Sequence, residues 1–131
     1  MKTYLDTSAL MKLVVAEHES PALQTYLGEL PTDTLFTAAL TRTELVRAAR
    51  RISAAAVTEA RRVLASLATV NLTSTLLDAA ANLDPPVLRS LDAIHLAAAQ
   101  RAGAELRAVI TYDARMSDAA RALAIPVLGP S

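Results

Sequence analysis

The stretch "KTYLDTSAL", residues Lys2 to Leu10, decides the fold. Its "TYL" segment is a short β-prone run, and "SALMKLVVAE", which follows, has the composition of a helix. Asp6 and two hydroxyl residues lie at the junction between them. Asp6 therefore either caps the following helix or forms one corner of a reactive site.

The same alternation of strand and helix continues along the chain. Further strands are predicted at "TLFTAAL" (34–40), "TVNLT" (69–73), "RAVITY" (107–112) and residues 126–128. Predicted helices cover residues 21–30, 41–52, 54–68, 75–83, 91–103 and 118–124. Ser20, Ser53, Thr73 or Ser74, Ser90 and Ser117 are the predicted caps of all of these except the second. Parallel strands need long crossovers, so this order predicts one three-layer α/β/α domain over residues 1–131, with a central, mostly parallel sheet of four to five strands.

Composition excludes several classes of protein. The chain has 131 residues and no cysteine, so disulfides, zinc ribbons and thiol catalysis are excluded. Lysine and arginine number 13 and are balanced by 13 acids, although six arginines lie between residues 42 and 62. That segment predicts a local basic surface suited to a phosphate backbone. No apolar run reaches about 18 residues and no signal-peptide core is present, so we expect a cytoplasmic protein without a membrane span.

Four of the acids are predicted to share one edge of the sheet. Asp6 ends the first strand, Asp113 follows "RAVITY", Asp92 lies in the first turn of its helix, and Glu44 lies about one turn into the helix after the second strand. In such a fold the carboxyl ends of strands and the amino ends of helices meet at the same edge.

Each acid alone also has a structural explanation, such as a helix cap, a favourable charge at a helix terminus or a turn residue. Together, four carboxylates would repel one another, and a hard cation relieves that repulsion. All-oxygen ligands suit Mg²⁺ or Mn²⁺ better than zinc. A metal held in this way can activate water for phosphodiester hydrolysis.

At these residues the chain resembles PIN-domain ribonucleases, and most closely the VapC-like toxins of toxin–antitoxin pairs. The matching segments are "YLDTSAL", "TRTELVRA", "SLDAIHLAAA" and "VITYDARM", which together span almost the whole chain. The resemblance implies a PIN-like fold, a Mg²⁺- or Mn²⁺-dependent endoribonuclease, a homodimer, and inhibition by a VapB-like antitoxin that inserts into the active-site groove. It implies that Asp6 and Asp92 are direct metal ligands and that Glu44 and Asp113 bind a second metal or orient water. It also implies that Ser8 and Thr111 are supporting hydroxyls.

Only four aromatic residues are present, so RNA recognition is expected to depend on phosphate contacts more than on base stacking. Candidate backbone contacts are Arg42, Arg89 and Arg115, with Arg47 and Lys12 as further candidates. His95, one turn after Asp92, is interpreted as a core-facing histidine with local hydrogen bonds rather than as a catalytic base.

Two other functions remain as alternatives. One is an aspartyl-phosphate phosphatase-like domain with Asp6 as the nucleophile, although the position two residues later is Ser8 instead of a second aspartate. The other is a non-catalytic α/β interaction module whose acids bind a basic segment of a partner.

Overall fold

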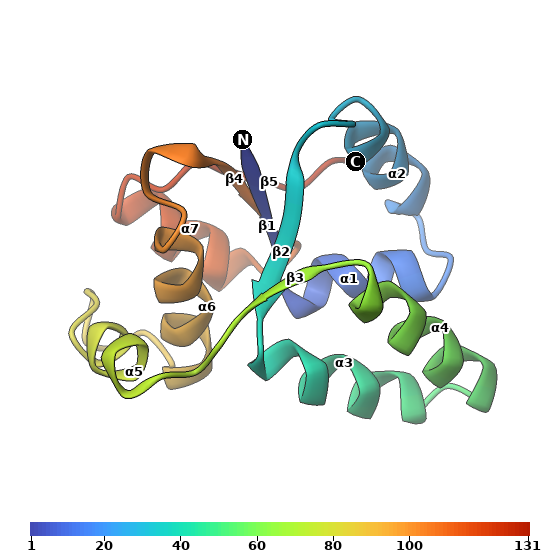
Figure 1. Ribbon diagram of the computed structural model, residues 1–131, viewed down its shortest axis with the longest axis horizontal. Helices are drawn as coiled ribbons and strands as arrows, with labels where there is room; N and C mark the ends of the chain where they lie inside the picture. Colours follow the sequence, from blue (N-terminus) through green and yellow to red (C-terminus); the bar gives the residue numbers. More distant parts are fainter.

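Five strands form one sheet in the computed structural model, which describes residues 1–131 (Figure 1). They are β1 (Lys2–Leu5), β2 (Thr34–Ala38), β3 (Ala68–Val70), β4 (Leu106–Ile110) and β5 (Val127–Leu128). The strand order is β3-β2-β1-β4-β5, and all four neighbouring pairs are parallel. The predicted central parallel sheet is therefore confirmed.

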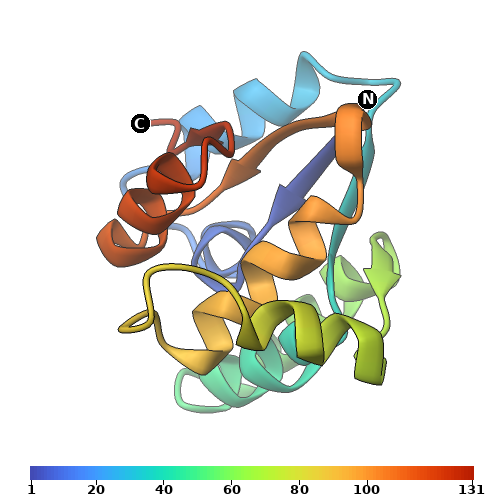
Figure 2. The same cartoon turned by 90° about the vertical axis from the view of Figure 1, so that its left-hand side faces the viewer.

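Seven α-helices cover the two faces of this sheet (Figures 1 and 2). They are α1 (Thr7–Val14), α2 (Ser20–Gly28), α3 (Leu40–Arg50), α4 (Ala54–Ala65), α5 (Ser74–Ala81), α6 (Ser90–Gln100) and α7 (Ala114–Ala122), with a short 3-10 turn, η1 (Gly103–Glu105), after α6. Helices α1 to α4 lie on one face and α5 to α7 on the other, which confirms the three layers. None of the helices combines the length and the apolar character that crossing a membrane requires.

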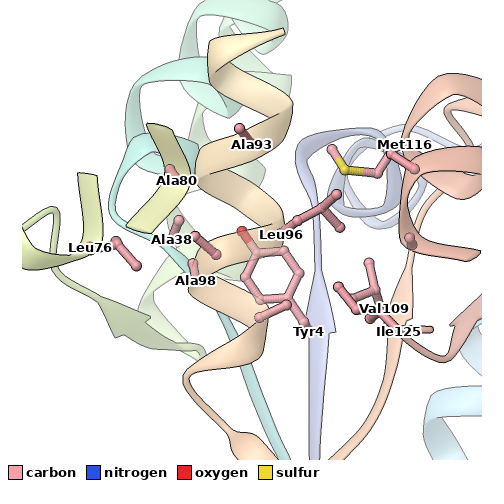
Figure 3. Packing of buried hydrophobic residues seen from close by; sticks show 14 of the residues in the cluster. Tyr4, Ala38, Leu76, Ala80, Ala93, Leu96, Ala98, Val109, Met116 and Ile125 are labelled. Carbon is pink, nitrogen blue, oxygen red and sulfur yellow. The ribbon is translucent and has the colours of Figure 1, made fainter. Parts of the chain in front are cut away.

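The alternation of side chains along the strands builds a separate core on each face. Tyr4 and Val109 point into a cluster with helices α5, α6 and α7, where Figure 3 shows Tyr4 beside Leu96. Leu5 and Ile110, the next residues along, point into a second cluster with α1 to α4. All four are fully buried, as expected for parallel strands that are covered on both faces.

The helix starts follow the predicted caps in two cases. Ser53 accepts a hydrogen bond from the Ala56 N–H, and Thr73 accepts one from the Leu76 N–H. The other three predicted caps are wrong, because the helices begin one to four residues earlier than expected.

Ser20 and Ser90 are the first residues of α2 and α6, whose N-caps are Glu19 and Arg89 without a side-chain bond. Ser20 instead accepts from the Glu17 N–H, so its hydroxyl holds the preceding loop. Ser117 lies inside α7, because Asp113, three residues after the end of β4, caps that helix. Most predicted elements also ran two to three residues too far: β2 stops at Ala38, α4 at Ala65, α6 at Gln100 and β4 at Ile110.

The order in which strands are added reverses beside β1. From β1 the chain builds β2 and β3 on one side, and then crosses to build β4 and β5 on the other. Ligands of open α/β sheets bind at such a reversal, beyond the carboxyl ends of the strands. Asp6 and Thr111, the residues that follow β1 and β4, lie at this position.

Candidate functional site

Asp6 is the most buried acid at this edge, with only 3% of its surface exposed. Its Oδ1 accepts from the Ala9 N–H at 2.9 Å, so it caps α1, and from the Ser8 hydroxyl at 2.7 Å. Its Oδ2 accepts from the Thr111 hydroxyl at 2.5 Å. Burial raises the pKa of Asp6 above its ordinary value, although these three hydrogen bonds oppose the shift. The carboxylate is thus held in place without a positively charged partner.

The two hydroxyls that hold Asp6 are themselves fixed. Ser8 Oγ accepts from the Tyr112 N–H at 2.9 Å, and Thr111 Oγ1 accepts from the Asp113 N–H at 3.1 Å. They also lie 3.3 Å from each other. This network joins the end of β1 to the end of β4, as the expected supporting role of both hydroxyls requires.

Asp92 and Asp113 lie beside Asp6. Asp92 is half-buried in the first turn of α6. Burial and repulsion from Asp113, with a smaller contribution from Asp6, raise its pKa, while His95 and Arg89 oppose the shift. Asp113 caps α7 by accepting from the Arg115 N–H at 2.9 Å. Asp92 is therefore within electrostatic reach of both Asp113 and Asp6.

Glu44 lies in the second turn of α3, and its side chain is 25% exposed. Its Oε1 accepts from the Thr7 hydroxyl at 2.6 Å and lies 2.7 Å from His95 Nε2. Burial alone would raise the pKa of Glu44, but the hydrogen bonds from His95 and Thr7 outweigh it, so the pKa is lowered. Glu44 is therefore ionised and held in one position.

His95 links Glu44 to the core. The histidine is 3% exposed, and its Nδ1 lies 2.6 Å from the Tyr4 hydroxyl. Burial raises the pKa of Tyr4, so the tyrosine keeps its proton. Every group has a partner when the Tyr4 O–H donates to His95 Nδ1 and the His95 Nε2–H donates to Glu44. His95 is buried as expected, but its partners come from β1 and α3 rather than from its own helix.

The chemistry of these donors fits a hard divalent cation. All the groups at the edge are oxygens, and no buried polar side-chain atom lacks a hydrogen-bond partner. Neither Asp6 nor Asp92 forms an ion pair within the fold, and Mg²⁺ or Mn²⁺ would supply a directly bound positive charge. As the side chains stand, no three Asp, Glu or His groups converge closely enough to hold a metal ion. The four acids expected to bind a metal therefore do not form a closed set of ligands, although Asp92 is within electrostatic reach of Asp6 and Asp113.

The predicted phosphate contacts divide between two places. Arg89 and Arg115 line a cavity of about 370 Å³ together with Asp92, at the acidic edge. Arg42 and Arg47 line a different groove, between α3 and α4. Lys12 is unsuited to phosphate binding, because its ammonium pairs with Glu17 at 3.0 Å and Glu19 at 3.2 Å.

Thr7, His95 and Tyr4 were not predicted as parts of the site. The spacing of three residues between Asp92 and His95, which puts both on one side of α6, was the available signal. The bonds from His95 to Tyr4 and Glu44 span 91 and 51 residues of sequence, so no local pattern reveals them.

Comparison with known proteins agrees with this geometry. The family model described as "PIN domain" matches residues 3–122. Two proteins of Mycobacterium tuberculosis, named Ribonuclease VapC35 and Ribonuclease VapC46, are each 45% identical to this chain. The first alignment covers 97% of this chain and 96% of the relative, and the second covers 98% and 97%.

The fold is also found among solved structures. VapBC2 from Rickettsia felis, solved bound to a DNA fragment from its promoter, superposes with a TM-score of 0.77. The superposition covers 100% of both chains at 11% sequence identity, so it compares the fold alone.

Proposed function

Because this chain belongs to the PIN-domain family, among its VapC-like endoribonuclease toxins, we propose that it hydrolyses RNA phosphodiester bonds with a divalent cation bound at the acidic edge. The observation that carries the metal dependence is Asp6, a buried carboxylate whose partners are two hydroxyls and one N–H and include no cation. The raised pKa of Asp92 supports it, since repulsion from neighbouring acids is one of its causes.

Asp6 and Asp92 are the proposed direct ligands of Mg²⁺ or Mn²⁺. The bound cation would polarise the phosphoryl oxygen and lower the pKa of a water molecule. Ser8 and Thr111 keep the Asp6 carboxylate in one orientation through their hydrogen bonds. Such supporting contacts matter because misplacing a ligand weakens both binding and catalysis.

Glu44 and Asp113 complete the proposed site. Glu44 is ionised, and both of its bonds go to Oε1, so Oε2 is available to accept a proton from water or to bind a second cation. Asp113 adds negative charge beside Asp92. Arg89 and Arg115, in the same cavity as Asp92, would bind the phosphates on either side of the bond that is cut.

A VapB-like antitoxin is the proposed inhibitor, and a homodimer the proposed assembly. The antitoxin would insert an arginine or lysine among the acids, because a cation from a partner relieves the same repulsion as a metal. Adding such an antitoxin should abolish cleavage, and light scattering of the purified toxin should give twice the mass of one chain. Full activity in the presence of a bound antitoxin would contradict this mode of inhibition.

RNA cleavage by the purified protein tests the proposed activity. Mg²⁺ or Mn²⁺ should support cleavage and EDTA should abolish it, and both Asp6→Asn and Asp92→Asn should be inactive. Asp78→Asn, at an exposed position in the middle of α5, is the matched control and should cleave like the wild type. Cleavage that survives both chelation and the two substitutions would refute the proposal. No cleavage by the free protein under any condition would favour the interaction module.

A further inference from the structure

Helices α3 and α4 enclose a basic groove away from the acidic cavity of Asp92. The two helices lie side by side (Figure 1), and the groove between them has a volume of about 490 Å³. Arg42, Arg47 and Arg50 of α3 and Arg61 of α4 line it, and no acid does. We call this surface the α3–α4 groove.

The four arginines of the α3–α4 groove have no acidic partner. Neither an ion pair nor a side-chain hydrogen bond engages any of them. By contrast, Arg62, next to Arg61 on the same helix, pairs with Glu59. The chain has no net charge, so four uncompensated guanidinium groups in one groove form a local excess of positive charge. Such an excess binds anions.

We propose that the α3–α4 groove is a second RNA-binding site that holds the phosphate backbone of the substrate outside the acidic edge. This inference rests on the proposed ribonuclease function. The groove follows α3 from Arg42 in its first turn to Arg50 in its last, a length of about 12 Å at 1.5 Å per residue. That length accommodates a short run of consecutive phosphates of one strand.

Continuity with the proposed active site favours RNA over an acidic protein segment. The amino end of α3 faces the carboxyl edge of the sheet, and Glu44 lies on the same helix, two residues after Arg42. An RNA strand that leaves the acidic edge along α3 therefore meets the arginines in sequence. Guanidinium groups bind phosphate through paired N–H donors, and the groove has no aromatic residue for base stacking. Binding there should depend on charge and not on base sequence.

The test is RNA binding in EDTA, so that it does not depend on cleavage. A fluorescein-labelled RNA stem-loop of about 20 nucleotides is titrated with protein at several salt concentrations. The double variant Arg47→Gln/Arg61→Gln should bind about tenfold more weakly. The slope of its log K plotted against log salt should be smaller by about 1.4–1.8, because two phosphate contacts are removed.

Arg62→Gln/Arg121→Gln is the matched control, since it removes the same charge from two exposed arginines that already pair with acids. It should stay within about twofold of the wild type and keep the wild-type salt slope. Circular dichroism and thermal unfolding would verify that both double variants are folded. The binding assay also distinguishes failure of this inference from failure of the proposed activity. Asp6→Asn should lose RNA cleavage and still bind the stem-loop.

Equal loss of affinity in both double variants would overturn the proposal, as would equal binding by the groove variant and the wild type. No binding of the stem-loop by the wild type would overturn it as well. A poly-glutamate peptide, titrated in parallel, addresses the protein alternative. If the groove variant lost the peptide and kept the RNA, the site would belong to an acidic protein segment instead.

Discussion

Asp33 and Asp6 lie at opposite ends of the same sheet, and the surroundings of the two carboxylates differ in one respect. The side chain of Asp33 is 1% exposed and accepts from Arg107 Nε at 2.6 Å, from Arg107 Nη2 at 3.0 Å and from the Thr3 hydroxyl at 2.9 Å. Asp6 also accepts three hydrogen bonds, but none comes from a cation.

The pKa values follow this difference. The bidentate bond from Arg107 lowers the pKa of Asp33 to about 2, while burial raises the pKa of Asp6. Hydrogen bonds alone therefore do not compensate a buried negative charge, whereas a guanidinium does. The negative charge of Asp33 is compensated within the fold by Arg107. Asp6 has no cationic partner within the fold, and in the proposed function a metal ion supplies that charge.

The largest expected effect separates activity from stability at Asp6. Asp6→Asn should lower the RNA cleavage rate by about a thousandfold, because it removes a ligand of the proposed metal. It should also raise the free energy of unfolding of the metal-free protein by about 0.5–2 kcal/mol, because a buried charge disappears. Cleavage assays and urea unfolding measure the two effects. If Asp6→Asn were less stable than the wild type and still fully active, Asp6 would be a structural acid like Asp33.

Substitution of His95 tests whether Glu44 needs the hydrogen bond from His95 in order to function in cleavage. His95→Ala should reduce cleavage by about 10- to 100-fold, since the carboxylate loses the donor that orients it. His95→Gln, which keeps a donor at a similar reach, should recover part of that loss. Rates per folded molecule would be compared with the unfolding midpoint of each variant. Equal rates in both variants and the wild type would show that Glu44 needs no positioning by the histidine.

Substitution of Arg107, at the opposite end of the sheet, should lower the stability of the protein without changing its activity. Arg107→Ala leaves Asp33 without its cation, and we expect a small decrease in the free energy of unfolding. The Arg107 side chain is 37% exposed, so water limits the loss. Cleavage per folded molecule should not change, and a large drop in that rate would mean that the two ends of the sheet are coupled.

The dependence of stability on pH should have opposite signs at the two acids. Asp33 has a lowered pKa in the folded protein, so its stabilisation is complete above its ordinary pKa and is lost as the pH falls from about 4 to about 2. The gap in stability between the wild type and Arg107→Ala should therefore shrink over that range. Asp6 has a raised pKa, so its ionisation costs stability as the pH rises. The advantage of Asp6→Asn should accordingly grow with rising pH, and thermal melts at several pH values would measure both trends.

The features predicted best from the sequence are those that depend on residues close to one another along the chain. The strand alternation and the parallel topology were predicted, and from them the acids could be assigned to one edge of the sheet. Ser53 was recognised as a cap, and Thr73 as one of two candidates with Ser74, because a cap bonds within three residues. The start of α7 was missed, since Asp113 was interpreted as the end of the preceding strand and Ser117 was chosen as the cap, whereas the strand ends at Ile110 and Asp113 caps the helix.

Contacts between distant segments could not be predicted. The bonds of His95 join three elements, and the pairing of Arg107 with Asp33 spans 74 residues. The α3–α4 groove depends on which arginines of two packed helices face each other. A cluster of arginines was visible in the sequence, but its division into paired and unpaired members was not.

The central claim is that the edge around Asp6 binds a divalent cation which the fold itself does not replace. The most direct measurement is the shift of the unfolding midpoint on addition of Mn²⁺ to the wild type, Asp6→Asn and Asp33→Asn. At a hundredfold excess over its dissociation constant, a bound ion stabilises the folded state by about 2.7 kcal/mol. The account predicts an increase of several degrees for the wild type and for Asp33→Asn, and none for Asp6→Asn. An equal shift in all three proteins, or no shift in the wild type, would contradict it.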